Sequence, residues 1–275
     1  MSKTRRLSSA FLGLPYIFWA AAFIVIPLIM VVWYGLTDEN GAFTFANVAA
    51  IANPAHSKAL LMALLLSFLA TVVCFLLAYP LCMFLVELQK GSDSFLTMLL
   101  IVPMWMNFLL RTYAWQSILE KTGIINTALT ALGFAPLRMI NTNGAIILGM
   151  VYNFLPFMVL PIYNALEKID KNVINAARDL GADGRITFLR VIFPLSLPGV
   201  ISGVTMVFIP ALTTFVVSSL LGGGKILLIG NVIEQEFMVA YDWNLGSGLS
   251  LVLLIFIIIN VVISAVTEKG EEAKA

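Results

Sequence analysis

One polar segment in the second half of the chain decides how the rest of the sequence is interpreted. It reads Asn175-Ala176-Ala177-Arg178-Asp179-Leu180-Gly181 and, after nine further residues, Val191-Ile192-Phe193-Pro194. Long apolar runs flank this segment on both sides. Because the interior of a bilayer offers no hydrogen bonds to irregular backbone, a polar segment between two spans must lie on one face of the membrane. We therefore expect residues 167–194 to form a docking loop.

The composition is that of an integral membrane protein. Hydrophobic residues make up 60% of the 275 residues and charged residues 11%, whereas about a quarter of the residues in soluble domains are charged. The mean hydropathy is +0.98. A helix needs about 20 apolar residues to cross the hydrocarbon core. Runs of that length lie near 12–34, 59–86, 95–117, 144–166, 195–221 and 246–266. We expect an all-α protein with six transmembrane helices and one domain, 1–275, whose core covers about 60–266.

The distribution of lysine and arginine predicts the orientation, because these residues accumulate on the cytoplasmic side of membrane spans. With the N-terminus inside, eleven of the 16 fall in inner segments and five in outer ones. Both termini and the loop 167–194 are then cytoplasmic. The first apolar run follows Lys3, Arg5 and Arg6 and continues to Val32. It is longer than the roughly 7–15 residues of a signal-peptide core, so we expect it to be retained.

Several kinds of chemistry find no support in the sequence. The nearest match to a phosphate-binding P-loop, Gly222-Gly223-Gly224-Lys225-Ile226, lacks the first glycine and the hydroxyl residue. With one histidine and two cysteines, neither a zinc site nor a catalytic triad can be assembled. Cys74 and Cys82 lie eight residues apart on one predicted helix, about 12 Å, too far for a disulfide. The net charge of +1 predicts no nucleic-acid partner. We expect no catalytic residues, no metal and no bound cofactor.

An ion-coupled secondary transporter is the alternative from another functional class. Such proteins usually keep ionisable residues within their spans, whereas all 15 carboxylates here fall in loops or at span ends. Arg111 alone lies inside a predicted span. Either its side chain reaches the membrane interface, as long cationic side chains do, or it pairs with a carboxylate of a partner.

The docking segment resembles the EAA loop of bacterial ABC-importer permeases, in which Glu-Ala-Ala, three residues, Gly, nine residues and Ile-x-Leu-Pro follow one another. Identical residues stand at Ala176, Ala177, Gly181 and Pro194, Val191 and Phe193 are similar in kind, and Asn175 replaces the usual Glu. The resemblance implies a type I importer permease fold and ABC ATPase subunits that hydrolyse ATP-Mg beneath it. The implied coupling residues are Asn175, Ala176, Ala177, Arg178, Asp179, Gly181, Ala182 and Pro194. Physically, small side chains let another protein approach the backbone closely, and a glycine lets the chain turn away.

Three further stretches resemble the permeases of spermidine/putrescine importers. They are Leu100–Asn107 with Arg111-Thr112-Tyr113, then Leu155–Tyr163, and Gly222–Lys225 followed by Leu227–Ile233. The resemblance implies a polyamine substrate, a second permease subunit, an extracytoplasmic solute-binding protein and a place among the lipids of a bacterial inner membrane. Related permeases carry thiamine, iron or other solutes, so another cargo remains an alternative.

The candidate substrate-pathway residues are rich in carboxylates and aromatic rings, which suit a flexible polycation. They are Trp105, from the first of those stretches, and Glu234, Phe237, Tyr241, Asp242 and Trp243. If 233–241 is helical, Glu234, Phe237 and Tyr241 share one face. The alternative is that this loop only contacts a binding protein or caps the last helix.

Overall fold

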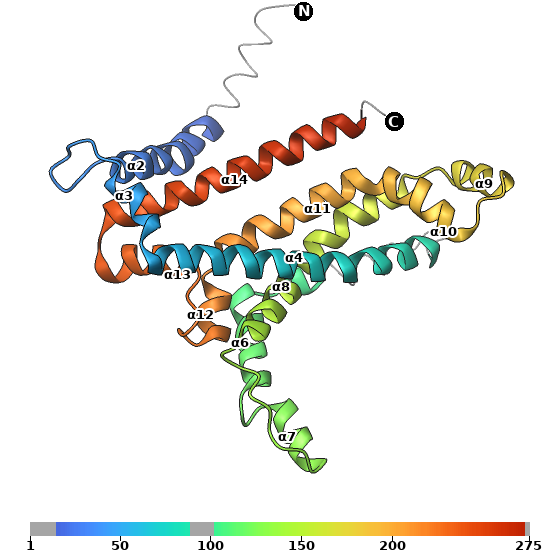
Figure 1. Ribbon diagram of the computed structural model, residues 1–275, viewed down its shortest axis with the longest axis horizontal. Helices are drawn as coiled ribbons and strands as arrows, with labels where there is room; N and C mark the ends of the chain where they lie inside the picture. Colours follow the sequence, from blue (N-terminus) through green and yellow to red (C-terminus); the bar gives the residue numbers. More distant parts are fainter. Residues whose placement is uncertain (1–14, 89–101, 273–275) are drawn as a thin grey trace, which may run out of the picture. The chain divides into compact units, whose positions relative to one another are not determined.

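The structure is a computed structural model and describes residues 15–88 and 102–272. Its regular elements are helices, and a single antiparallel bridge joins Thr37 to Phe43 (Figure 1). By internal contacts the chain divides into two compact units. The first combines the described residues up to Ser57 with Val232–Ile255, and the second combines Lys58–Asn231 with the residues from Phe256 onward. The expectation of one domain over 1–275 stays a prediction.

Five helices of the described residues are long and apolar enough to cross a membrane. They are Pro15–Gly35, Pro54–Leu88, Asn143–Glu167, Gly184–Thr213 and Trp243–Val266. These helices match five of the six predicted spans. The predicted span 95–117 begins among residues outside the described part, and the part that is described is not one helix. There a 3-10 turn, Val102–Trp105, precedes helix α6, Phe108–Leu119.

Asn107 explains why the chain starts a new helix at this point. Its side-chain oxygen accepts hydrogen bonds from the backbone N–H groups of Leu109 (2.8 Å) and Leu110 (3.4 Å). An asparagine in this position satisfies donors that the first helical turn leaves free. The predicted span 95–117 places Asn107 in its interior, so this helix start is not predicted from the sequence.

Helices α4 (Pro54–Leu88), α8 (Asn143–Glu167) and α11 (Phe193–Thr213) form the centre of the second unit (Figure 1). The thiols of Cys74 and Cys82 on α4 donate to backbone carbonyls of α8 at 3.8 and 3.3 Å. Both cysteines are buried and free, as their helical spacing predicts. At Gly199 of α11, a Cβ would lie 2.5 Å from the carbonyl oxygen of Pro161. The backbones of α8 and α11 therefore approach closely, which small residues permit in membranes.

Two of the prolines coincide with widened helical turns. The π-helical turn Ala21–Val25 precedes Pro27 on α2 (Ile26–Gly35), and the π-helical turn Phe188–Ile192 precedes Pro194 on α11. A proline has no N–H and its ring meets the carbonyl four residues earlier. A wider turn relieves that contact without ending the helix.

The last eight residues of the predicted span 195–221 are not part of the long helix. Helix α11 ends at Thr213, Thr214 is extended, and a separate helix α12, Val216–Gly222, follows. The amide of Asn231, on α13 (Ile229–Gln235), holds this break. Its nitrogen donates to the Phe215 carbonyl (3.0 Å) and the Ser219 hydroxyl (2.8 Å). Its oxygen accepts from the Ser218 hydroxyl (2.5 Å) and the Leu228 N–H (3.1 Å).

The first unit packs the end of α2 and the short α3 (Ala46–Ala49) on the beginning of α14 (Trp243–Glu272). A Cβ on Gly248 would lie 2.5 Å from the backbone of Asn47, and one on Gly35 would lie 3.1 Å from the backbone of Gly248. The amides of Asn47 and Asn244 both donate to the carbonyl of Thr37, at 2.8 and 2.6 Å. These contacts fix the loop that follows α2.

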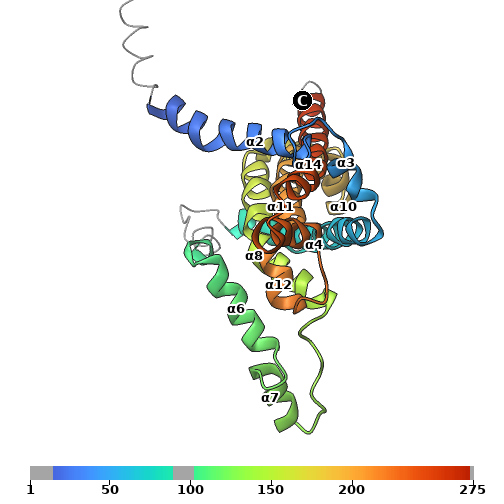
Figure 2. The same ribbon diagram turned by 90° about the vertical axis from the view of Figure 1, so that its left-hand side faces the viewer.

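Figure 2 shows α6 and α7 (Ile124–Ala131) following one another along an arm at the edge of the second unit. Helix α6 contacts α8 through two pairs of aromatic rings. Phe108 stacks near Phe154 with centroids 6.3 Å apart, and Trp115 meets Tyr152 edge-on at 5.4 Å. Buried Asn126 holds α7 to the segment that follows it. Its amide nitrogen donates to the Leu137 carbonyl, and its amide oxygen accepts from the Leu137 N–H.

Candidate functional site

The polar segment between the third and fourth described spans forms a short, fully capped helix. Helix α9, Lys171–Asp179, begins after Asp170, whose carboxylate accepts from the N–H of Asn172 at 2.8 Å. At the other end Gly181 has a φ of 84°, the left-handed region that glycine adopts readily. The N–H groups of Gly181 and Ala182 donate to the carbonyls of Arg178 (2.9 Å) and Ala177 (3.0 Å). This pair of bonds is the Schellman ending.

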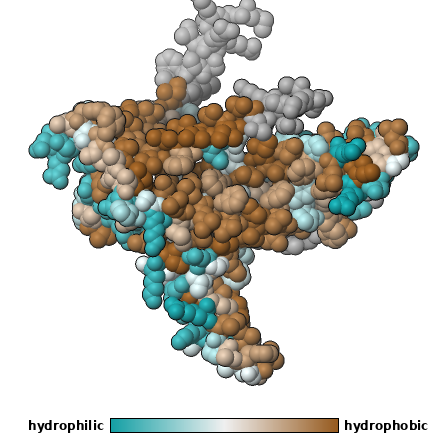
Figure 3. Space-filling view, viewed as in Figure 1, coloured by the Kyte–Doolittle hydropathy of each residue, from teal (hydrophilic) through white to brown (hydrophobic). Residues whose placement is uncertain are grey.

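The free side of α9 carries apolar side chains at helical spacing. Val173, Ala176 and Leu180 follow one another at i, i+3 and i+7 and are exposed, Leu180 by 90%. We call these three residues the α9 stripe. Figure 3 shows hydrophilic residues gathered at the end of the molecule that carries α9, in contrast to the apolar surface along α4. Exposed apolar side chains within a polar segment are typical of a protein interface.

The structure places the predicted coupling residues in two groups. Asn175, Ala176, Arg178, Asp179 and Gly181 are exposed, while Ala177, Ala182 and Pro194 are half-buried. Asn175 lies in the middle of α9, so it does not cap a helix start; Asp170 does.

The predicted loop 167–194 was too long. After the ending at Gly181, Asp183 caps a new helix by accepting from the N–H of Ile186 at 2.7 Å. From Gly184 the chain is helical through to Thr213. Pro194 therefore lies in the long helix that follows α9, and its place in the coupling element stays a prediction.

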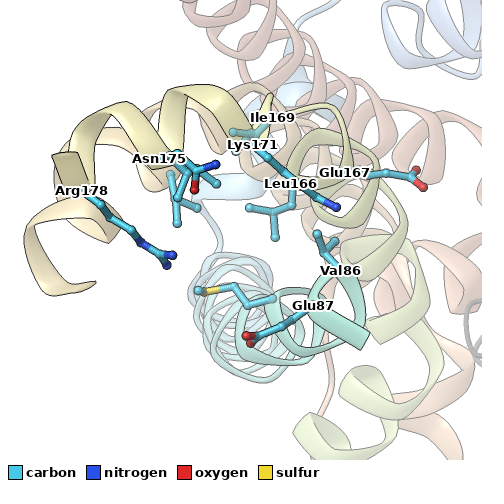
Figure 4. A pocket seen from close by; sticks show the side chains of 11 residues that line it. Val86, Glu87, Leu166, Glu167, Ile169, Lys171, Asn175 and Arg178 are labelled. Carbon is cyan, nitrogen blue, oxygen red and sulfur yellow. The ribbon is translucent and has the colours of Figure 1, made fainter. Parts of the chain in front are cut away.

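Behind α9 lies a pocket of about 360 Å³ between this helix and the ends of α4 and α8 (Figure 4). Its lining combines apolar side chains with four charged ones: Glu87, Glu167, Lys171 and Arg178. Asn175 lines the same pocket, and in Figure 4 it and Arg178 both extend from α9. A glutamate at position 175 would therefore stand in a pocket shared with Arg178.

The candidate substrate-pathway residues of the first unit do not form the predicted helical strip. Helix α13 passes into a π-helical turn, Glu236–Ala240, and Tyr241 ends it with a φ of 56°. A π turn shifts the register, so Tyr241 does not follow Glu234 on one face. Phe237 instead packs edge-on against Trp243, with ring centroids 5.5 Å apart, and lies beside Gly246.

A second pocket, of about 550 Å³, gathers some of these residues with others that the sequence did not single out. Tyr241, Asp242 and Trp243 line it together with Tyr34 and Glu39. We call it the acidic–aromatic pocket. Asp242 also accepts from the N–H of Leu245 at 2.8 Å, which caps α14.

The remaining predicted pathway residues stand outside that lining. Glu234 and Phe237 are half-buried in the first unit. Trp105 belongs to the second unit, where it is 80% exposed at the end of its 3-10 turn. Tyr34 and Glu39 lie about 200 residues before Tyr241 in the sequence, and no local sequence pattern connects them to it. Their place in the same pocket is seen only in the folded structure.

A family model and curated proteins match most of the chain. The model, described as "Binding-protein-dependent transport system inner membrane component", matches residues 61–268. The chain is 38% identical over 245 residues to the spermidine/putrescine transport system permease protein PotB of Haemophilus influenzae, covering 86% of each protein. It is 40% identical to PotB of Escherichia coli K12 over 245 residues, covering 86% of this chain and 89% of that one.

Two kinds of solved structure share the fold. A bacterial ABC transporter involved in the import of alginate matches with a TM-score of 0.78 at 15% identity, over 97% of this chain and 96% of that one. The MetNI methionine ABC transporter matches with a TM-score of 0.57 at 18% identity, over 78% and 95%. At these identities the likeness concerns the fold alone, and it confirms the expected all-α fold of type I importer permeases.

Proposed function

The chain belongs to the family of binding-protein-dependent transport system inner membrane components, and we propose that it is the permease subunit of an ATP-driven polyamine importer. The family is one of transport subunits, which agrees with a role without catalysis of its own. The observation that carries the proposal is the similarity to the spermidine/putrescine permeases along 86% of the chain. The proposed substrate is therefore a flexible aliphatic polycation.

In this proposal α9 is the contact to the ATPase subunits. Its two caps make a short helix that keeps its shape outside the membrane, and the α9 stripe offers apolar side chains to a groove. The helix that follows runs from Gly184 to Thr213 without interruption. A displacement of α9 is then passed to a membrane span through only four residues, 180–183. ATP-Mg is bound and hydrolysed by the partner, and this chain needs no cofactor.

The acidic–aromatic pocket is the proposed contact for the cargo. Glu39 and Asp242 supply carboxylates, and Tyr34, Tyr241 and Trp243 supply aromatic faces. Ammonium groups are attracted to both kinds of group. Glu234, Phe237 and Trp105 remain proposed contributors along the pathway.

The proposed setting is the bacterial inner membrane, with both termini and α9 on the cytoplasmic side. A second permease subunit would complete the pathway, and an extracytoplasmic binding protein would deliver the polyamine. No nucleic acid takes part.

The test is uptake of radiolabelled spermidine and putrescine into vesicles that contain the complete complex with its binding protein. Wild-type complex is expected to accumulate polyamine only with ATP. Glu39→Gln, Glu234→Gln and Tyr241→Ala are expected to lower uptake severalfold and to leave basal ATP hydrolysis unchanged, since one cation–π or screened charge contact is worth about 1 kcal/mol. A wild-type complex that ignores polyamines and carries thiamine or iron would overturn the proposed cargo.

A further inference from the structure

Arg111 on α6 is a buried cation to which the described residues supply no counter-charge. Its side chain is 7% exposed, and two guanidinium nitrogens, Nε and Nη1, are buried without a hydrogen-bond acceptor. A side chain this buried is not extended along the outer surface of α6, as the first of the two possibilities that the sequence left open requires. A buried guanidinium needs acceptors, because burying an unpaired charge is costly.

The immediate surroundings of Arg111 do not supply these acceptors. The neighbouring Thr112 is fully buried, and its hydroxyl faces the amide nitrogen of Asn153 on α8 at 3.4 Å. The amide oxygen of Asn153 is also buried without a donor. Helix α6 thus contacts α8 through satisfied aromatic pairs on one side, while the charge beside them stays unmatched.

The chain's own carboxylates cannot provide the counter-charge from a second copy. All 15 lie in loops or at span ends, and Glu120, the next one along α6, is nine residues from Arg111. Nine residues of helix correspond to about 13 Å. Because no carboxylate of this chain falls inside a predicted span, we look for the counter-charge of Arg111 on a different molecule.

The surface around Arg111 favours a protein over a lipid. Leu109, Leu110 and Tyr113 are exposed by 45, 64 and 50% on the adjoining faces of α6. Such a surface fits a helix that covers it, and a carboxylate on that helix can enter between α6 and its neighbours. A lipid phosphate stays at the headgroup level, whereas a carboxylate on a covering helix can lie at any depth of the membrane.

We propose that Arg111 forms an ion pair with an Asp or Glu in a membrane span of a second, different permease subunit. The pair would hold α6 in the assembled importer and would require a heteromeric complex, since a second copy of this chain has no carboxylate at that depth. The inference rests on the proposed function only in assuming a second permease chain.

The variant Arg111→Met is expected to have opposite effects on the isolated chain and on the assembled complex. In the isolated chain it removes an unmatched buried charge, so the melting temperature in detergent is expected to rise. In the complex it leaves the partner's carboxylate unpaired, so recovery of the second permease with the tagged chain is expected to fall at least about tenfold. Lys121→Glu, an exposed charge reversal after α6, is the matched control and should change neither measurement.

A charge exchange identifies the partner residue. With Arg111→Glu in this chain, each Asp or Glu in the spans of the second permease is changed to Arg in turn, and one exchange is expected to restore recovery of the complex and polyamine uptake.

Unchanged recovery of the second permease with Arg111→Met would overturn the inference. So would a melting temperature that rises with added phosphatidylglycerol in the wild type but not in Arg111→Met, which would assign the counter-charge to a lipid phosphate. Wild-type complex that assembles through Arg111 but carries no polyamine would refute only the proposed cargo.

Discussion

Replacing Gly181 tests whether the ending of α9 carries the coupling between ATP hydrolysis and transport. Gly181→Leu places a branched side chain at a φ of 84°, with no atom within 4 Å of the added Cβ. The substitution therefore causes backbone strain without a clash. That strain is about 1–2 kcal/mol for an L-residue in the left-handed region. A domain stable by about 5–15 kcal/mol stays folded under this load.

The same strain is large compared with the free energy that holds the Schellman ending of α9 in place. Each 1.4 kcal/mol changes an equilibrium about tenfold, so the Schellman ending would be lost in most molecules. Leu180 would then leave its position in the α9 stripe, and Ala182 would lose its bond to the Ala177 carbonyl. We expect Gly181→Leu to be inserted and folded, with ATP-driven uptake reduced at least about tenfold.

The chain offers two matched controls for this experiment. Gly184 is also exposed with no atom near its Cβ but has no positive φ, so Gly184→Leu adds the same bulk without the strain. Gly181→Asn keeps a residue that tolerates the left-handed conformation. Both variants should retain most of the uptake. Uptake at the wild-type rate in Gly181→Leu, with normal amounts of protein in the membrane, would refute the assignment of α9 as the coupling element.

Three further substitutions test the structure at other points. Asn175→Glu should be tolerated, with uptake within a few-fold of wild type, because the new carboxylate shares its pocket with Arg178; complete loss of transport would show that this position does not follow the family pattern. Asn231→Ala should lower the free energy of unfolding by about 2–4 kcal/mol, since it removes the four hydrogen bonds of this buried amide, and an unchanged melting temperature in detergent would contradict the proposed role of the amide. Tyr79→Phe removes the 2.7 Å hydrogen bond to Ser196 and should destabilise the chain by only about 1 kcal/mol while lowering uptake per ATP hydrolysed; equal coupling ratios for variant and wild type would count against a role in transmission.

The sequence predicted the helix in the polar segment and five of the spans because each depends on neighbours along the chain. Polar spacing located α9, and the small residues and Gly181 indicated a helix with a turn after it. The helix breaks were harder to predict. Thr214 and Phe215 lie in an apolar run whose composition suits a continuous span. The start of the second helix is instead held by Asn231, 16 residues later, whose amide donates to the Phe215 carbonyl.

The two pockets and the charge of Arg111 depend on residues distant in the sequence. Glu39 and Asp242 are 203 positions apart, and hydropathy gives no sign that they line one pocket. Arg111 is buried in the fold, whereas the isolated sequence allowed its side chain to reach the interface. Periodicity can place a residue on a helix face, but which faces meet is decided by the fold.

If α9 is the coupling element, as proposed, its movement would enter the membrane helices through the helix that begins at Gly184. The continuous helix after Gly184 contains its π-helical turn at Phe188–Ile192, where one carbonyl per wide turn is less tightly held. Tyr79 of α4 packs there against Phe188 and Phe193, with centroids 5.7 and 5.8 Å apart, and its hydroxyl reaches Ser196. A widened turn bends more easily than an α-helix, while the aromatic contacts keep α4 and α11 together. A push on α9 would therefore move α4 and the start of α11 as one body, with bending concentrated at the turn that Pro194 imposes.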